Sequence, residues 1–177
     1  SGVAGFGGSL IVLPVFSLLI GAKAAVPVLT IAWLMGNLSR AGFGYREIRR
    51  APVGLFCLGA VPSAIVGSRV FVALPPEAIG KAMAVFLLGV AGLRRFDVRF
   101  PIPEKGFIIC GLVTGFLSAV LGSAGPIGAV AFLSLRLPPT AYVASEAVTA
   151  VAMHLAKTIL YGKYALISWP DVGVGLG

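Results

Sequence analysis

Long apolar segments separated by short hinges dominate this sequence and restrict what it can fold into. Hydrophobic residues make up 58% of the chain and charged residues 11%, whereas charged residues make up about a quarter of an ordinary soluble domain. About 20 apolar residues in a helix are long enough to cross a bilayer. The runs of this kind are residues 24–43, 53–74, 78–93, 106–121 and 139–164. We therefore expect an all-α, polytopic helical membrane protein.

The basic residues of the chain concentrate in the hinges between these runs. The formal net charge is +8, which in a polar chain would suggest a nucleic-acid partner. Here the arginines gather in hinges at residues 44–52 and 94–105, where an excess of positive charge marks the cytoplasmic side of a membrane protein. We therefore expect the lipid bilayer as the environment of this chain and no nucleic acid as its partner.

Residues 139–164 combine an apolar composition with a polar face. At 100° per residue, Glu146, His154 and Lys157 fall on one side of the expected helix. The same side carries Thr149, Met153 and Tyr161, and the opposite side carries Val148, Val151, Ala152, Leu155 and Ile159. Ionisable residues inside a membrane are costly and usually face the protein interior or a water-filled path. This helix is therefore expected to turn its polar face inward.

Two glycine-rich segments, residues 5–9 and 122–128, each precede a short apolar piece of the kind that forms a half-helix. Such a break frees backbone groups that lipid cannot satisfy, so it must be buried in protein or line a cavity. The N-terminus of the helix that follows would present N–H groups and the positive end of a dipole, which suits an anion. The predicted donors are Gly5, Gly7, Gly8, Gly122, Ser123 and Gly125. Alternatively, the glycines only allow helices to pack closely.

The two halves of the chain resemble each other at an offset of 117 residues. This offset pairs the two glycine-rich segments, and it also pairs Asn37 with His154 and Arg40 with Lys157. We expect a first repeat over residues 1–100 and a second over residues 101–177, together forming one membrane domain. The charge distribution favours an inverted repeat, although a parallel repeat results if the short pieces merely continue the preceding helices.

The paired polar positions predict an anion site. Arg40 and Lys157 would attract the anion, Asn37 and His154 would donate hydrogen bonds to it, and Glu146 or His154 would carry a coupling proton. Each residue also has a simpler explanation. The two cations could extend to the headgroups, Glu146 could lie near the interface, and His154 could link two helices.

Other function classes have little support in the sequence. We find no serine, histidine and aspartate combination of a hydrolase, no metal-binding motif and no phosphate-binding loop, so we expect neither an enzyme nor a cofactor or metal site. Cys57 and Cys110 are isolated in apolar runs and are expected to be inert. The chain begins at Ser1 and ends within another apolar segment, residues 172–177, so we expect a piece of a longer protein. Trp169 is placed where an interfacial anchor is expected.

Two stretches of the chain resemble the TauE/SafE family of membrane transporters, often called sulfite exporters. They are GFGGSLIVLPVFSLLIGAKAAVPVLT near the start and GFLSAVLGSAGPIGAVAFLSLRLPPTAYVASEAVTAVAMHLAKTILYGKYALI in the second half. The resemblance implies a multi-pass carrier of the bacterial inner membrane that moves small sulfur-containing anions such as sulfite, sulfonates or sulfoacetate, coupled to protons. An anion or small-solute channel without coupled transport is the alternative, and a non-transporting assembly or sensor subunit is a third hypothesis. The direction of transport and the oligomeric state stay open.

Overall fold

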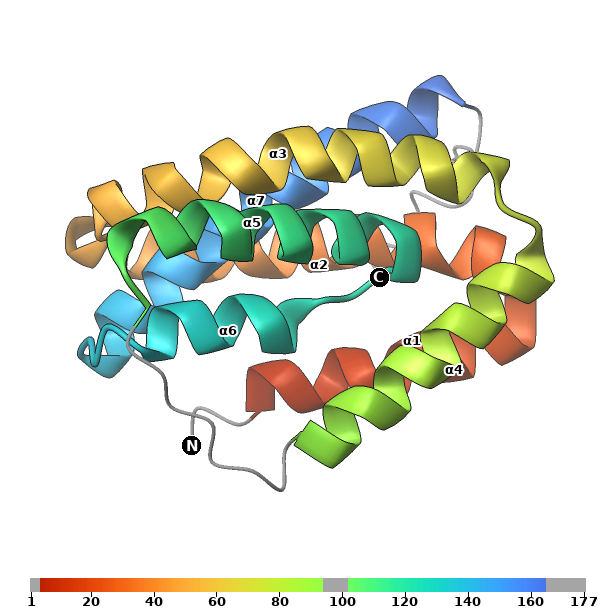
Figure 1. Cartoon of the computed structure of the whole chain (residues 1–177), viewed down its shortest axis with the longest axis horizontal. Helices are drawn as coiled ribbons and strands as arrows, with labels where there is room; N and C mark the ends of the chain where they lie inside the picture. The colour runs from red at the N-terminus through yellow and green to blue at the C-terminus, as the bar shows by residue number, and fades with distance from the viewer. Residues whose placement is uncertain (1–3, 94–101, 165–177) are drawn as a thin grey trace.

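The computed structural model is helical throughout the residues that it describes, 4–93 and 102–164, and it contains no strand in these ranges (Figure 1). Its elements are α1 (Ala4–Ile20), α2 (Ala22–Phe43), the 3₁₀ turn η1 (Tyr45–Glu47), α3 (Arg50–Ala73), α4 (Pro76–Leu93), α5 (Glu104–Leu121), α6 (Gly125–Leu133) and α7 (Pro139–Lys163).

Four of these helices, α2, α3, α5 and α7, are long and apolar enough to cross a membrane. Each coincides with an apolar run of the sequence, and its ends lie within about one helical turn of those expected. The prediction of an all-α membrane fold is therefore confirmed. The expected anchor at Trp169 and the apolar segment at residues 172–177 lie outside the described residues.

Helices α3 and α5 pack against each other through small residues. A Cβ atom added at Gly111 would collide with the carbonyl oxygen of Phe56, and one added at Gly59 would collide with that of Ile108. Gly115, one turn after Gly111, lies equally close to the carbonyl oxygen of Ala60. Small residues spaced four apart let two membrane helices approach until their backbones touch. The small residues along α3 therefore allow α5 to pack closely against it.

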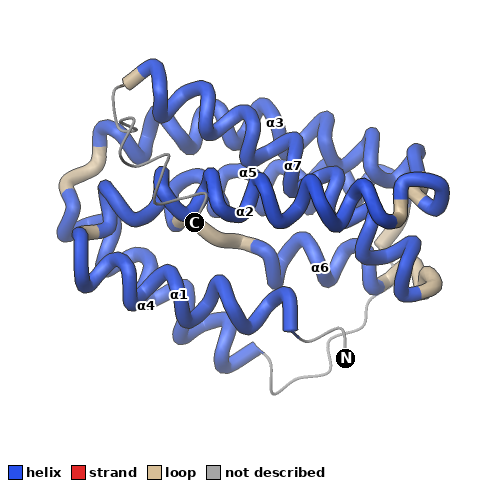
Figure 2. The backbone as a smooth tube through the Cα atoms, turned by 180° about the vertical axis from the view of Figure 1, so that it is seen from behind, coloured by secondary structure: helices blue, strands red, loops and turns tan. Residues whose placement is uncertain are grey.

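Helices α2 and α7 lie side by side and run in opposite directions (Figures 1 and 2). Near the end of α2, Gly44 lies against Ala144 in the second turn of α7. Near the start of α2, Val26 shares a buried cluster with Tyr161 at the far end of α7. The 117-residue offset pairs these two helices, so their opposite directions agree with an inverted repeat. The repeat itself stays a prediction.

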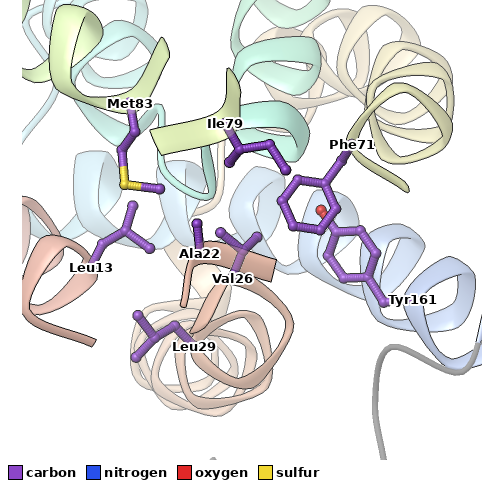
Figure 3. Packing of buried hydrophobic residues seen from close by; sticks show 8 residues of the cluster. All are labelled: Leu13, Ala22, Val26, Leu29, Phe71, Ile79, Met83 and Tyr161. Carbon is purple, nitrogen blue, oxygen red and sulfur yellow. The ribbon is translucent and has the colours of Figure 1, made fainter. Parts of the chain in front are cut away.

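A buried apolar cluster connects α1 and α4 to the other helices (Figure 3). Its members come from α1, α2, α3, α4 and α7: Leu13, Ala22, Val26, Leu29, Phe71, Ile79, Met83 and Tyr161. The rings of Phe71 and Tyr161 pack with their centroids 5.3 Å apart. Burial of this apolar surface holds the ends of α2, α3 and α7 together at one end of the molecule.

Positively charged residues lie at both ends of the helices. The backbone N–H of Arg49 donates to Ser145 Oγ at 3.0 Å, so the hinge of residues 44–50 lies beside the start of α7. The connection from α6 to α7, which contains Arg136, is at the same end (Figure 1). Lys23 lies at the other end, where its ammonium donates to the carbonyl oxygen of Val72 at 3.0 Å. Arg69, in the last turns of α3, adds a second positive charge there.

The two glycine-rich segments adopt different structures. In the second half, α5 ends at Leu121, Gly122 adopts a positive φ of 83°, and α6 is a half-helix of 9 residues. In the first half, α1 already begins at Ala4, so that segment forms the first turns of a 17-residue helix, not the break that we expected. The difference has a physical reason. Pro126, which lacks an N–H group, lies in the first turn of α6 directly after Gly125, whereas Ser9 occupies the matching position in α1 and continues the helix.

Candidate functional site

The polar face of α7 is turned into the protein, as the sequence predicts. Glu146, His154 and Lys157 are all buried, as are Thr149, Met153 and Tyr161. On the opposite face, Leu155 and Ile159 are half or more exposed. The cost of placing polar groups in hydrocarbon explains this orientation, because only the interior offers them partners.

This face borders a cavity of about 240 Å³ enclosed mainly by α2, α5, α6 and α7. Six of the predicted site residues line it: Asn37, Arg40, Ser123, Gly125, Glu146 and His154. Thr114 and Ser118 of α5 and Trp33 of α2 contribute further polar or aromatic surface. The cavity thus brings together polar groups from both halves of the sequence inside a group of membrane-spanning helices.

Arg40 and Glu146 form an ion pair in the wall of this cavity. Nη2 of Arg40 lies 3.0 Å from Oε2 of Glu146, and the side chains are 34% and 11% exposed, respectively. Asn37 orients the guanidinium, because its Oδ1 accepts a hydrogen bond of 3.0 Å from Nη1 of Arg40. The amide nitrogen of Asn37 in turn donates to the carbonyl oxygen of Trp33 at 2.8 Å. Glu146, on α7, therefore has Arg40, on α2, as its partner.

Arg40 also lines a second pocket, of about 270 Å³, at the hinge end of the molecule. This pocket lies between the last turn of α2, the η1 turn and the first turn of α7, and it includes Phe43, Glu47 and Thr140. Glu47 accepts a hydrogen bond from the hydroxyl of Thr140, which joins the two sides of the pocket. The Arg40–Glu146 ion pair therefore stands between the second pocket and the cavity.

Lys157 lies just behind the cavity wall and contacts the end of α5. Its ammonium is fully buried and donates to Oγ of Ser118 at 2.9 Å and to the carbonyl oxygen of Ser118 at 3.2 Å. One turn later, the hydroxyl of Tyr161 donates to the carbonyl oxygen of Ala119 at 2.8 Å. These contacts satisfy carbonyl groups at the interrupted end of α5, where the helix has no partners of its own for them.

The structure does not bring the two predicted cations together. Lys157 lies about three turns beyond Glu146 on α7, or about 16 Å along the helix axis, and Arg40 is paired with Glu146. Gly122 packs against Leu13 and Val26. Gly5, Gly7 and Gly8 lie in the first turns of α1.

The sequence analysis missed Thr114 and Ser118, which are one turn apart on the face of α5 that lines the cavity. Their spacing is the signal that could have identified them. Two hydroxyl residues four positions apart, beside Gly111 and Gly115, mark the face of an apolar helix that meets other helices. In the described parts of the chain, no three histidine, cysteine, aspartate or glutamate side chains gather as a metal site would require.

A comparison with protein families decides the class of this chain. A model of the family described as Sulfite exporter TauE/SafE matches residues 1–177. The chain belongs to this family. TauE/SafE proteins are membrane transporters, and the four apolar helices agree that this one is a multi-pass membrane protein. Searches of curated proteins and of solved structures each gave no match.

Proposed function

We propose that this TauE/SafE protein carries a small sulfur-containing anion, of the sulfite, sulfonate or sulfoacetate type, across the bacterial inner membrane in exchange or symport with protons. The cavity among the spanning helices is the observation that carries this proposal. It is lined by an arginine, an imidazole and several hydroxyl groups from helices that are long and apolar enough to span the membrane.

The size of the cavity supports a small substrate. Its volume of about 240 Å³ corresponds to roughly eight water molecules at ~30 Å³ each. Pockets for drug-sized ligands begin at about 300 Å³. An oxyanion with a few heavy atoms and part of its hydration shell fits this space, whereas a peptide or a nucleotide does not.

The electrostatics of the site support an anion. Arg40 faces both the second pocket and the cavity, so its guanidinium is placed to attract a negative charge that enters from the hinge end. The N-terminus of α6, at Gly125, borders the same cavity and adds the positive end of a helix dipole. Lys157 adds a buried positive charge next to Ser118.

Proton coupling is proposed to use Glu146 and His154, which are the carboxyl and imidazole groups on the buried face of α7. Glu146 is held by Arg40, so an anion that binds Arg40 competes with the carboxylate. A carboxylate displaced from its cation gains a proton more readily. Anion entry and protonation of Glu146 are thereby linked.

Proteoliposomes containing the full-length protein test this function. Uptake of labelled sulfite, taurine or sulfoacetate is measured with and without a pH gradient, while an internal pH-sensitive dye reports proton movement. We expect saturable uptake of at least one anion accompanied by proton flux. Arg40→Gln should lower this uptake at least tenfold, because the variant removes the cation that faces both pockets. Glu146→Gln should uncouple proton flux from anion flux.

Arg46→Gln is the matched control, because Arg46 belongs to the exposed hinge and bonds to its neighbour Tyr45 outside the cavity. It should transport like the wild type. Non-saturable conductance without proton flux would instead identify an anion channel. Uptake that is unchanged in Arg40→Gln would contradict the proposed role of the cavity.

A further inference from the structure

Most polar side chains of the cavity already have partners. Asn37 bonds to Trp33 and Arg40, and Arg40 bonds to Glu146. The hydroxyl of Thr149 donates to the carbonyl oxygen of Glu146 at 2.8 Å, within its own helix. Part of the hydrogen-bonding capacity of these side chains is therefore already used within the protein.

Two buried polar atoms in the cavity wall have no partner within the described parts of the chain. They are Oγ1 of Thr114 and Nδ1 of His154. Thr114 is 1% exposed and His154 is 7% exposed. A buried polar group without a hydrogen bond costs about 1–3 kcal/mol, so such atoms usually have a water or a ligand as partner. Two of them in one cavity wall indicate a binding position.

Thr114 lies beside the start of the half-helix α6. A Cβ atom placed on Gly128 would be 3.3 Å from Cγ2 and 3.9 Å from Oγ1 of Thr114, so Thr114 packs against the first turn of α6. The residue before that helix is Ala124, whose side chain cannot cap it. The positive end of the α6 dipole therefore faces the same space as Thr114.

The buried amino group of Lys157 lies next to this space. Ser118 lines the cavity one turn beyond Thr114, and its Oγ accepts the hydrogen bond from the ammonium of Lys157 at 2.9 Å. His154, one turn before Lys157 on α7, completes the wall. We call the part of the cavity lined by Thr114, Ser118, Gly125, Gly128 and His154 the inner chamber.

We propose that the inner chamber is the oxyanion-binding subsite of this transporter, with Oγ1 of Thr114 and Nδ1 of His154 as hydrogen-bond donors to the anion. This assignment rests on the proposed function. The ligand class is a small oxyanion such as sulfite or the head of a sulfonate, because its oxygens accept from the hydroxyl and from the Nδ1–H tautomer of the imidazole. The α6 dipole and the ammonium of Lys157 balance its charge. Arg40 then acts at the entrance, and Thr114 contacts the substrate.

Equilibrium binding to the purified full-length protein tests the subsite. Labelled sulfite, taurine and sulfoacetate are the probes, and the wild type identifies which of them binds. Thr114→Val keeps the shape of the side chain and removes its hydroxyl, so it should raise the Kd of that probe about tenfold or more, as expected for one hydrogen bond to a charged group. Thr114→Ser keeps the hydroxyl and should bind within about threefold of the wild type.

Thr158→Val is the matched control, because Oγ1 of Thr158 is also buried without a partner in the described structure, but Thr158 does not line the cavity. It should leave the Kd unchanged. His154 provides a second variant if Thr114→Val does not fold. His154→Asn, which can place an amide N–H near the position of Nδ1, should bind more tightly than His154→Leu.

The outcomes separate the subsite from the function. Binding by Thr114→Val that equals binding by Thr158→Val overturns the subsite while the transport function stands. Equal affinities of His154→Asn and His154→Leu also overturn it. If the wild type neither binds nor transports any of the three probes, the proposed function fails, and the subsite fails with it.

Discussion

The ion pair between Arg40 and Glu146 predicts an unequal effect of removing either partner. At their separation of 3.0 Å, two unit charges attract each other by about 5.5 kcal/mol at an effective dielectric constant of ~20. The burial of each side chain determines how much of this attraction contributes to the free energy of unfolding. The carboxylate is 11% exposed, whereas the arginine side chain is 34% exposed and reaches the second pocket.

Arg40→Gln leaves a nearly buried carboxylate without its cation. We expect this variant to lose about 3 kcal/mol of unfolding free energy, the lower end of the range for breaking a buried pair. Glu146→Gln leaves a guanidinium that still has Asn37 and water as partners, so it should lose only about 1 kcal/mol. The double variant should be more stable than Arg40→Gln alone, because it contains no unpaired charge.

Equilibrium unfolding in mixed micelles measures the three variants beside the wild type. Arg46→Gln, in the exposed hinge, should change the unfolding free energy by less than about 0.5 kcal/mol. The reasoning is refuted if Glu146→Gln is the more damaging of the two single changes, or if the double variant is as unstable as the sum of both. Either result would mean that the buried carboxylate does not depend on Arg40.

Three further changes test the packing that shapes the cavity. Gly111→Ala should destabilise the protein by about 1–3 kcal/mol, because the added methyl group pushes α3 away from α5. Gly89→Ala should not destabilise it, because no atom lies within 4 Å of the added Cβ. Unfolding in micelles measures both variants. Tyr161→Phe should cost about 1–3 kcal/mol because it leaves the carbonyl of Ala119 without this donor, and the same change at the exposed Tyr164 should cost less than about 0.5 kcal/mol. Gly122→Ala should cost about 1–2 kcal/mol for its positive φ and should raise the KM for anion uptake in proteoliposomes.

Hydrophobic length and periodicity were enough to predict the helices and the inward face of α7. The lengths of the runs specify which segments can span a membrane. The 100° period places Glu146, His154 and Lys157 on one face, and the cost of polar groups in hydrocarbon determines that this face is buried. Both inferences depend on local sequence and on the membrane as solvent, so they need no knowledge of the neighbouring helices.

The partners of these residues could not be predicted in the same way, because they depend on tertiary packing. Thr30, Thr114 and Thr149 all lie in apolar helices, and the spacing of Thr114 from Ser118 marks a face that meets other helices without showing whether the hydroxyl has a partner. In the structure, Thr30 and Thr149 donate to carbonyl oxygens of their own helices, a common solution for a buried threonine. Thr114 does not have a partner among the described residues and faces the cavity. Which hydroxyl has no partner within the protein is determined by tertiary packing, not by the local sequence.

The direction of the helices explains why equivalent positions have different surroundings. The 117-residue offset pairs Arg40 with Lys157, and the simplest expectation is that both contact one anion. Because α2 and α7 are antiparallel, a position near the end of α2 meets the start of α7, and the matching position of α7 lies near the start of α2. Arg40 therefore lies at the hinge end with Glu146, while Lys157 lies about 16 Å further along α7 at the end of α5. The antiparallel arrangement of α2 and α7 thus places Arg40 at the hinge end of the cavity and Lys157 behind its wall beside Ser118. Under the proposed function, an anion moving inward from the hinge end would pass Arg40 before it reached Ser118.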